Sequence, residues 1–339
     1  MKPEMAPDDN TFMISSAQLR CGLSPLGASV RRLQWQDGSG RWTDVVLSPE
    51  RYDPALPEPA LAGRTVGPCC GRIRNGEITI DRLSLSLARN EGDHHLHGGP
   101  HGCAFSVWKG TRLSPQEVRF ELSLPDGLDG YPGNRTVRAD YRADDRGLSV
   151  RYSAETDRDT FLDLTNHIYW DLGGLFDGSA LDQTLEIAAK IMVLNDAQHL
   201  PVSLAKAENV FDFTRPQTLR EMISAYPGEE QLRIGRGYNN AFLLDPALQA
   251  EKGFSARLRS PRSGITMTLQ TNAPALVLYT GGFLGEETPL CTPPGAASPG
   301  CAVALEAQYI PDAFHLPGAD PVLLRPGTLF TREIRWSFA

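Results

Sequence analysis

Short stretches in which apolar and polar residues alternate recur along most of the chain. The clearest is residues 117–124, where every second residue is apolar. The same alternation recurs in residues 136–141, 148–152, 255–258 and 264–269. A period of two over many short stretches is typical of half-buried antiparallel strands.

Turn residues separate several of these stretches. Asp37-Gly38 follows the β-rich stretch 29–36 and precedes 42–47, which predicts a hairpin. Asn75-Gly76 lies between residues 71–74 and 77–80 and predicts a second hairpin in the same way.

Helical patterns are few. Residues 216–226 have a proline near the start and apolar residues at a spacing of three to four, and residues 245–251 could form another short helix. We found no alternation of strands and helices, no G-x-G-x-x-G and no internal repeat. We therefore expect an all-β fold, a large antiparallel β-sandwich with one or two short helices. Residues 13–339 would form a single domain after a disordered or loosely packed tail, residues 1–12.

Composition narrows the class of protein. The formal net charge is −8, with 41 acidic and 33 basic residues, which argues against nucleic-acid and anionic-membrane partners. No apolar run approaches the roughly 18 residues of a membrane helix, and the first ten residues carry no apolar signal segment. The six cysteines form no C-x-x-C pair or regular framework. These features predict a cytoplasmic protein with reduced thiols.

Four of the seven histidines, His94, His95, His97 and His101, fall within eight positions. They could be surface residues of a polar loop, or His95 and His97 could begin a metal site, although a third ligand with suitable spacing is missing. The glycines around them favour a third interpretation, a sharp turn that lets a small ligand approach the backbone closely. His97 would then contact that ligand.

Two further residues could carry proton-transfer chemistry. His167 lies in a β-type stretch, where a histidine is often a satisfied core residue, but Asn166 could hold its ring, and Tyr169 and Trp170 could offer aromatic surface to a sugar. Glu306 follows the apolar stretch 302–305, so it should be paired with an arginine such as Arg72 or have a function. An imidazole and a carboxylate in one cleft can pass protons in both directions.

The sequence resembles the aldose 1-epimerase, or galactose mutarotase, family from about residue 28 to 338. The matching pieces occur in the family's order, and Leu-His-Gly-Gly and Leu-Thr-Asn-His are specific. They are Gly71-Arg72-Ile73, Asn90 with Leu96-His97-Gly98-Gly99, Gly130-Tyr131-Pro132-Gly133, Leu164-Thr165-Asn166-His167, Phe211-Asp212-Phe213, Tyr279-Thr280-Gly281, and Leu305-Glu306-Ala307-Gln308 with Pro311-Asp312.

The resemblance implies a galactose-mutarotase-like supersandwich and a cofactor-independent isomerase without a metal, acting on a free sugar. Glu306 resembles the general base and His167 the general acid, with His97 and Arg72 as sugar-binding residues. Asn239, Asn90 and Gln308 are further substrate-binding candidates. We expect a monomer or a homodimer. Ordinary pKa values near 4.3 for Glu and 6.5 for His would give both groups the required protonation around neutral pH.

The sequence also departs from the family pattern. Asn239 stands where members have an aspartate that holds sugar hydroxyls, and Ala273 replaces a glutamine expected to contact sugar; Trp170 and Asp171 replace Phe and Asn. We therefore expect epimerase chemistry with altered sugar specificity. The alternatives are a carbohydrate-binding or regulatory protein of the same fold that has lost activity, and a metal-dependent sugar enzyme built on the histidine cluster.

Overall fold

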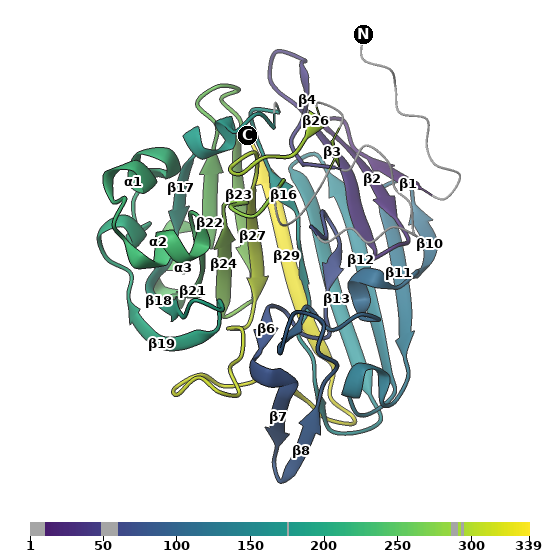
Figure 1. The fold of residues 1–339 in the computed structure, drawn as a ribbon. Helices are drawn as coiled ribbons and strands as arrows, with labels where there is room; N and C mark the ends of the chain where they lie inside the picture. The colour runs from purple at the N-terminus through teal and green to yellow at the C-terminus, as the bar shows by residue number, and fades with distance from the viewer. Residues whose placement is uncertain (1–10, 49–59, 175, 286–290, 293–294) are drawn as a thin grey trace.

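A nine-stranded antiparallel sheet is the layer to which the rest of the chain is attached (Figure 1). The computed structural model describes residues 11–48, 60–174, 176–285, 291–292 and 295–339. In order across the sheet the strands are β10 (Lys109–Ser114), β11 (Glu117–Leu124), β12 (Arg135–Asp144), β13 (Gly147–Thr156), β29 (Phe330–Phe338), β23 (Thr266–Thr271), β22 (Ala256–Arg259), β17 (Thr184–Ile187) and β20 (Gln217–Thr218).

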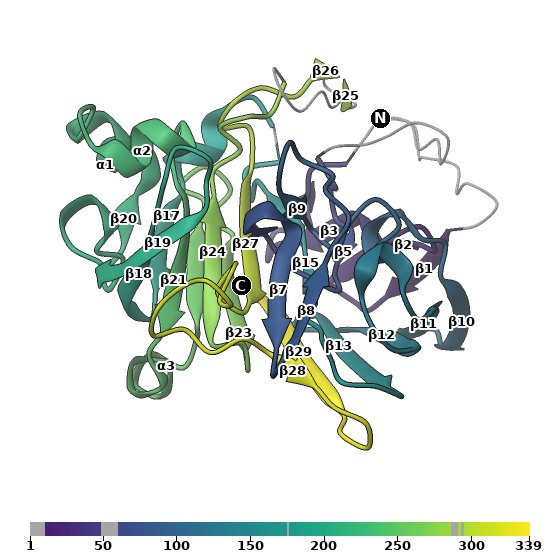
Figure 2. The same ribbon diagram turned by 60° about the horizontal axis from the view of Figure 1, so that its bottom comes forward.

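Two smaller antiparallel sheets pack beside each other on one face of this layer; in Figure 2 the four-stranded sheet lies at the right and the six-stranded sheet at the left. The four-stranded sheet contains β1 (Phe12–Ser15), β2 (Leu19–Ser24), β3 (Ser29–Gln36) and β4 (Trp42–Asp44). The six-stranded sheet has the order β16 (Tyr169–Trp170), β27 (Val303–Gln308), β24 (Ala275–Tyr279), β21 (Asn239–Leu244), β18 (Ala189–Asn195) and β19 (Pro201–Lys206).

Strand alternation explains why one core serves all three sheets. In β29, every second residue from Phe330 to Phe338 is buried, so this strand has one face toward the core. Phe338 stacks on Trp35 of the four-stranded sheet and also contacts Trp170 of the six-stranded sheet. The prediction of a large antiparallel β-sandwich is therefore confirmed.

Five two-stranded ladders complete the strands of the described residues. They are β5 (Thr65–Val66) with β15 (Thr165–Asn166), β6 (Arg72–Ile73) with β9 (His95–Leu96), β7 (Glu77–Ile80) with β8 (Leu83–Ser86), β14 (Thr160–Phe161) with β28 (Leu323–Leu324), and β25 (Cys291–Thr292) with β26 (Gly295–Ala296).

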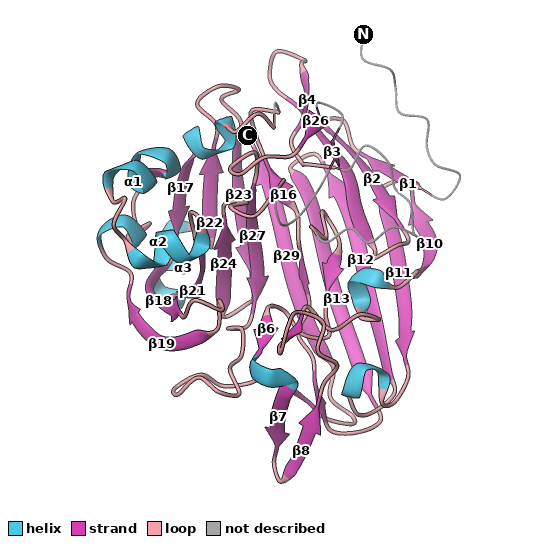
Figure 3. Cartoon of the chain, in the orientation of Figure 1, coloured by secondary structure: helices cyan, strands magenta, loops and turns pink. Residues whose placement is uncertain are grey.

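The described residues form three short α-helices, which lie on the same side of the molecule (Figure 3). The two expected helices correspond to α1 (Leu219–Ala225) and α3 (Pro246–Lys252); α1 begins later than predicted because Gln217–Thr218 pairs with β17 as β20. The third, α2 (Glu230–Gly235), was not predicted. Within the described residues, none of these helices is long and apolar enough to span a membrane.

Two local predictions need correction. The Asn75-Gly76 hairpin does not form, because β6 pairs with β9 and β7 pairs with β8, which leaves a short 3-10 turn between β6 and β7. The expected tail extended to residue 12, but Phe12 begins β1 and packs edge-on against Phe120, while residues 1–10 lie outside the described residues.

Candidate active site

The six-stranded sheet has one face in the core and the other in a cavity of about 690 Å³. In β27, Leu305 and Ala307 belong to the core, whereas the intervening Glu306 and the following Gln308 line the cavity. The opposite wall is formed by β6, β9 and their adjoining loops, together with the segment around His167. Strand periodicity alone therefore turns Glu306 away from the core and toward a possible ligand.

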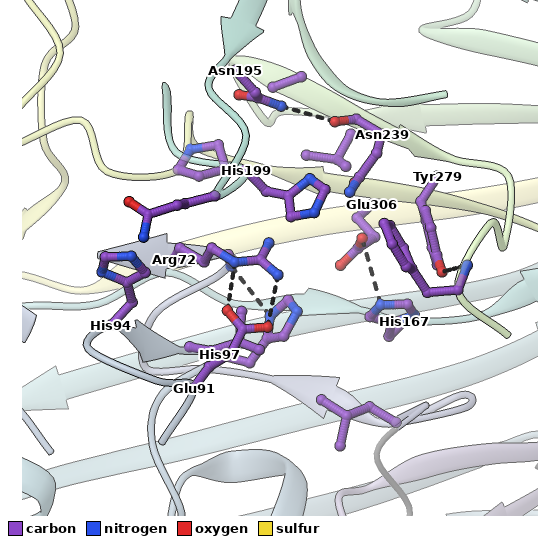
Figure 4. A pocket seen from close by; sticks show the side chains of 18 of the residues that line it. Arg72, Glu91, His94, His97, His167, Asn195, His199, Asn239, Tyr279 and Glu306 are labelled. Carbon is purple, nitrogen blue, oxygen red and sulfur yellow. Dashed lines mark hydrogen bonds and ion pairs between the residues drawn. The ribbon is translucent and has the colours of Figure 1, made fainter. Parts of the chain in front are cut away.

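His167 and Glu306 face each other across this cavity (Figure 4). The Nε2 atom of His167 lies 3.7 Å from Oε1 of Glu306, and their side chains are only 8% and 5% exposed. Backbone hydrogen bonds hold His167 on both sides, since its N–H donates to the carbonyl of Arg64 and its carbonyl accepts from the N–H of Gly63. The aromatic ring of Tyr169 packs 4.7 Å from the imidazole ring.

The second carboxylate oxygen of Glu306 is available to a ligand. Oε2 is buried and has no hydrogen-bond partner among the described residues. Burial, and next the negative charge of Asp163, raise the pKa of Glu306 to about 8. The expectation of an ordinary glutamate pKa is thus wrong, because that expectation assumed a solvated carboxylate. A raised pKa makes this carboxylate a stronger base when it is ionised.

His97 is held as a neutral ring in the turn that was predicted from its glycines. Its Nδ1 accepts a hydrogen bond from the N–H of Gly71 at 3.2 Å, so the ring proton is on Nε2. Burial, then the nearby His167, Arg72 and His95, hold the pKa of His97 well below its usual value. The ring packs edge-on to His167 at 5.7 Å, so the cavity contains a neutral donor beside the facing imidazole.

The turn around His97 depends on glycine. His97, Gly98 and Gly99 all have left-handed backbone angles. A side chain on Gly98 would place its Cβ atom 2.1 Å from the carbonyl oxygen of Gly67, which no residue other than glycine can accommodate. The Leu-His-Gly-Gly sequence therefore fixes His97 against the backbone of Gly71.

The sequence left open whether Arg72 pairs with Glu306. In the structure Arg72 pairs with Glu91 instead. Its Nε and Nη2 atoms donate to Oε2 and Oε1 of Glu91 at 2.5 and 2.7 Å. Arg72 and Glu91 both line the cavity, so the guanidinium reaches the ligand space with its charge compensated (Figure 4). Glu91 was not predicted as a site residue, because its contact with Arg72 depends on how the loop before β9 folds over β6.

The three remaining candidates, Asn239, Asn90 and Gln308, also line the cavity. The Asn239 side chain is directed into the cavity near Glu306, and its backbone carbonyl accepts from Nδ2 of Asn195 (Figure 4). The amide of Asn90 is bonded to both backbone groups of Leu96, and Nε2 of Gln308 donates to the carbonyls of Cys70 and Tyr309. These last two side chains hold the walls of the cavity together.

Several expectations about neighbouring residues are wrong. Ala273 is a core residue and does not line the cavity, and Trp170 is likewise fully buried in the core, because its strand position points away from the ligand space. The Asn166 amide donates to the carbonyl of Gly63 and to Tyr141, so it does not hold the His167 ring.

The histidine cluster does not converge on one point. His95 bonds to the carbonyl of Ala88 and to the hydroxyl of Tyr131, away from His97, and His101 is paired with Asp129 at the surface. Within the described ranges, no group of three or more His, Cys, Asp or Glu side chains is arranged to hold a metal ion.

The cavity also contains residues that the sequence analysis missed. The polar ones include Asn195, Gln198 and His199, from the end of β18 and the loop after it, and the apolar ones include Val193, Ala241 and Val277. Neither set follows a motif, because both depend on the register between neighbouring strands.

Comparison with known proteins places these features in one family. A family model described as aldose 1-epimerase matches residues 11–337. The chain is 32% identical to galactose mutarotase of Sus scrofa over 99% of this chain and 96% of the relative, and 30% identical to aldose 1-epimerase of Escherichia coli over 99% and 98%. A solved aldose epimerase homologue from C. elegans superposes with a TM-score of 0.86 at 29% identity, covering 97% of this chain and 98% of that chain.

Proposed function

Since the chain belongs to the aldose 1-epimerase family, we propose that it interconverts the α and β anomers of a free aldose, with Glu306 and His167 as the proton-transferring groups. The protein is then an isomerase. The observation that carries the assignment of residues is the 3.7 Å approach of Nε2 of His167 to Oε1 of Glu306 inside the cavity.

In the proposed reaction Glu306 and His167 together carry one proton. Ionised Glu306 takes the proton from the C1 hydroxyl of the cyclic sugar while protonated His167 gives its proton to the ring oxygen. The bond between C1 and the ring oxygen breaks, and the open chain carries an aldehyde. After rotation about the C1–C2 bond, the chain hydroxyl returns its proton to His167 as it attacks C1, and Glu306 returns its proton to the new C1 oxygen.

Burial of the pair supports this reaction. A carboxylate with a raised pKa is a better match for the weakly acidic C1 hydroxyl than an ordinary glutamate. Each positioned acid or base typically contributes about 10²–10⁴ in rate. The neutral Nε2–H of His97 and the guanidinium of Arg72 are hydrogen-bond donors for the sugar oxygens, and Asn239, Asn90 and Gln308 complete the proposed binding residues.

The charges that line the cavity favour a neutral sugar over a phosphorylated one. Arg72 is bonded to Glu91, and Asp93 and Glu306 add further acidic groups. Among the described residues, no second arginine and no lysine lines the cavity: Arg74 contacts Asp196, and Arg135 donates to the carbonyls of Gly133 and Pro125.

The sequence supports three further proposals. The net charge of −8 favours a protein without nucleic-acid partners. The unpatterned cysteines, five of which are free and buried, favour a cytoplasmic protein. We propose a monomer or homodimer.

A panel of aldoses tests the function. Freshly dissolved α-glucose, α-galactose and other α-aldoses are followed by polarimetry with and without the protein. We expect at least one sugar to reach anomeric equilibrium faster than in buffer. If every sugar in the panel equilibrates at the buffer rate, the protein is not an epimerase of these aldoses; saturable binding without turnover would then favour the binding-protein alternative.

A further inference from the structure

The wall of the cavity next to Glu306 is aliphatic. Val277 on β24 is paired in register with Glu306 on β27, and Ala241 on β21 is paired with Val277. Val193 on β18 belongs to the same packed cluster. We call Val193, Ala241 and Val277 the aliphatic row; all three line the cavity.

The aliphatic row differs from the next row along the same strands. One pleat away, Asn239 on β21 is paired with Tyr279 on β24, and Asn195 donates a hydrogen bond to the backbone of Asn239. All three of these residues line the cavity too. This wall of the cavity thus contains a polar row and an aliphatic row. Both rows begin on β24, the strand next to the one that carries Glu306.

Strand spacing determines which part of a sugar meets the aliphatic row. Neighbouring strands lie about 4.8 Å apart, so Val277 is about one spacing from Glu306 and Ala241 about two. His167 lies on the opposite side of Glu306, at the β16 edge of the sheet. A sugar whose C1 oxygens lie at His167 and Glu306 can extend toward β24 and β21, and a carbon remote from C1 then lies on Val277 and Ala241.

A hydroxyl group on that carbon would find no hydrogen-bond partner in the aliphatic row. The side chains of Val277 and Ala241 have no hydrogen-bonding atom, so a hydroxyl pressed against them would lose its water without gaining a protein partner. A methyl or methylene group at the same place buries apolar surface against apolar surface.

Resting on the proposed epimerase function, we propose that the aliphatic row selects deoxy aldoses, sugars in which one hydroxyl remote from C1 is replaced by hydrogen. Val277 is the specificity-determining residue, because it lies nearest to Glu306. Deletion of the right hydroxyl raises kcat/KM over that of the parent sugar by about tenfold, within the range that a single group in an apolar pocket provides.

The test measures kcat/KM for anomer exchange with glucose, galactose and their 3-, 4- and 6-deoxy counterparts. Wild-type protein should prefer at least one deoxy sugar to its parent by about tenfold. Val277→Thr, a change of nearly equal size that adds a hydroxyl, should reduce this ratio several-fold by giving the parent's hydroxyl a partner. Ala241→Ser provides a second polar substitution in the row if the first variant does not fold.

Val202→Thr is the matched control, because Val202 lies on β19 of the same sheet, is 47% exposed and does not line the cavity. It should leave the ratio unchanged. Turnover of the parent sugars at least as fast as of every deoxy sugar would overturn the inference and leave the proposed function intact. A deoxy preference that Val277→Thr and Ala241→Ser leave unchanged would also overturn it. No turnover of any aldose would overturn the proposed function and, with it, this inference.

Discussion

Glu91 holds Arg72 through both carboxylate oxygens, and both residues line the cavity. The two planar groups match in a fork that fixes the direction of the guanidinium. The side chains are 20% and 38% exposed, so the pair lies at the boundary between cavity and solvent. Glu91 is therefore a positioning residue for Arg72 in the proposed reaction.

Substitution of Glu91 should affect binding more than chemistry. Glu91→Gln removes the charged partner, and we expect KM for a neutral aldose to rise about tenfold with kcat changed little, the loss of roughly one charge-assisted hydrogen bond. Glu77→Gln is the control, because Glu77 pairs with Arg89 at 3.7 Å on the surface. An unchanged KM, or a loss confined to kcat, would remove the positioning role.

The rate should depend on pH through Glu306. Burial raises the pKa of this carboxyl to about 8, so most of the free enzyme holds Glu306 protonated at lower pH. The active pair carries one proton, so after subtraction of the uncatalysed rate kcat/KM should fall as the pH rises above about 8 and that proton is lost. A profile that stays flat from pH 7 to 9.5 would show that no group with a raised pKa is used.

Stability should also depend on pH through Glu306. The folded pKa of Glu306 is about 8 and the unfolded value about 4.5, so unfolding releases a proton between these pH values. The free energy of unfolding therefore falls as the pH rises through this window, by up to about 5 kcal/mol at 1.36 kcal/mol per pH unit.

Glu306→Gln removes that dependence, so the variant should gain stability relative to wild type as the pH increases from 5 to 8.5. Denaturant unfolding at both pH values measures the gain. Glu333→Gln, an exposed substitution on β29, should show none. Parallel stability curves for wild type and Glu306→Gln would contradict the raised pKa.

His97 should remain neutral across the pH range in which the protein works. Its Nδ1 accepts the Gly71 N–H, and burial lowers its pKa well below 6.5. Long-range proton–nitrogen NMR spectra of the imidazole rings should show His97 protonated on Nε2 alone, without a titration step near pH 6.5. The exposed ring of His101 is a suitable comparison in the same spectra. A step near 6.5 at His97 would refute this assignment.

The sequence predicted most of the fold because its signal was local. Alternation in residues 117–124 and 136–141 corresponds to β11 and β12, whose neighbours in the sheet are also neighbours in the chain. The Asn75-Gly76 hairpin failed because β6 finds its partner in β9, a pairing that the local turn signal could not reveal. Helix α2 was missed because it has only six residues and is capped by Glu229, an uncommon capping residue.

The candidate site was likewise predicted only where its residues lie in local motifs. His97, His167 and Glu306 were recognised because they lie in motifs, and strand alternation explains why Glu306 faces the cavity. Glu91 and Val277 could not be predicted, since one depends on the path of a loop and the other on the register of β24 with β27. Ala273, which stands in place of the family's glutamine, was expected to alter specificity. It is buried in the core.

Anomer exchange in single variants of the facing pair tests the central claim most directly. Magnetisation transfer between the α and β signals of an equilibrated aldose is measured for wild type, Glu306→Gln and His167→Asn, each shown to be folded, with Glu333→Gln as control. We predict that the two cavity variants lose at least about 100-fold of the wild-type exchange rate and that the control loses none. Exchange at the wild-type rate in either folded cavity variant would contradict the assignment of Glu306 and His167 as base and acid.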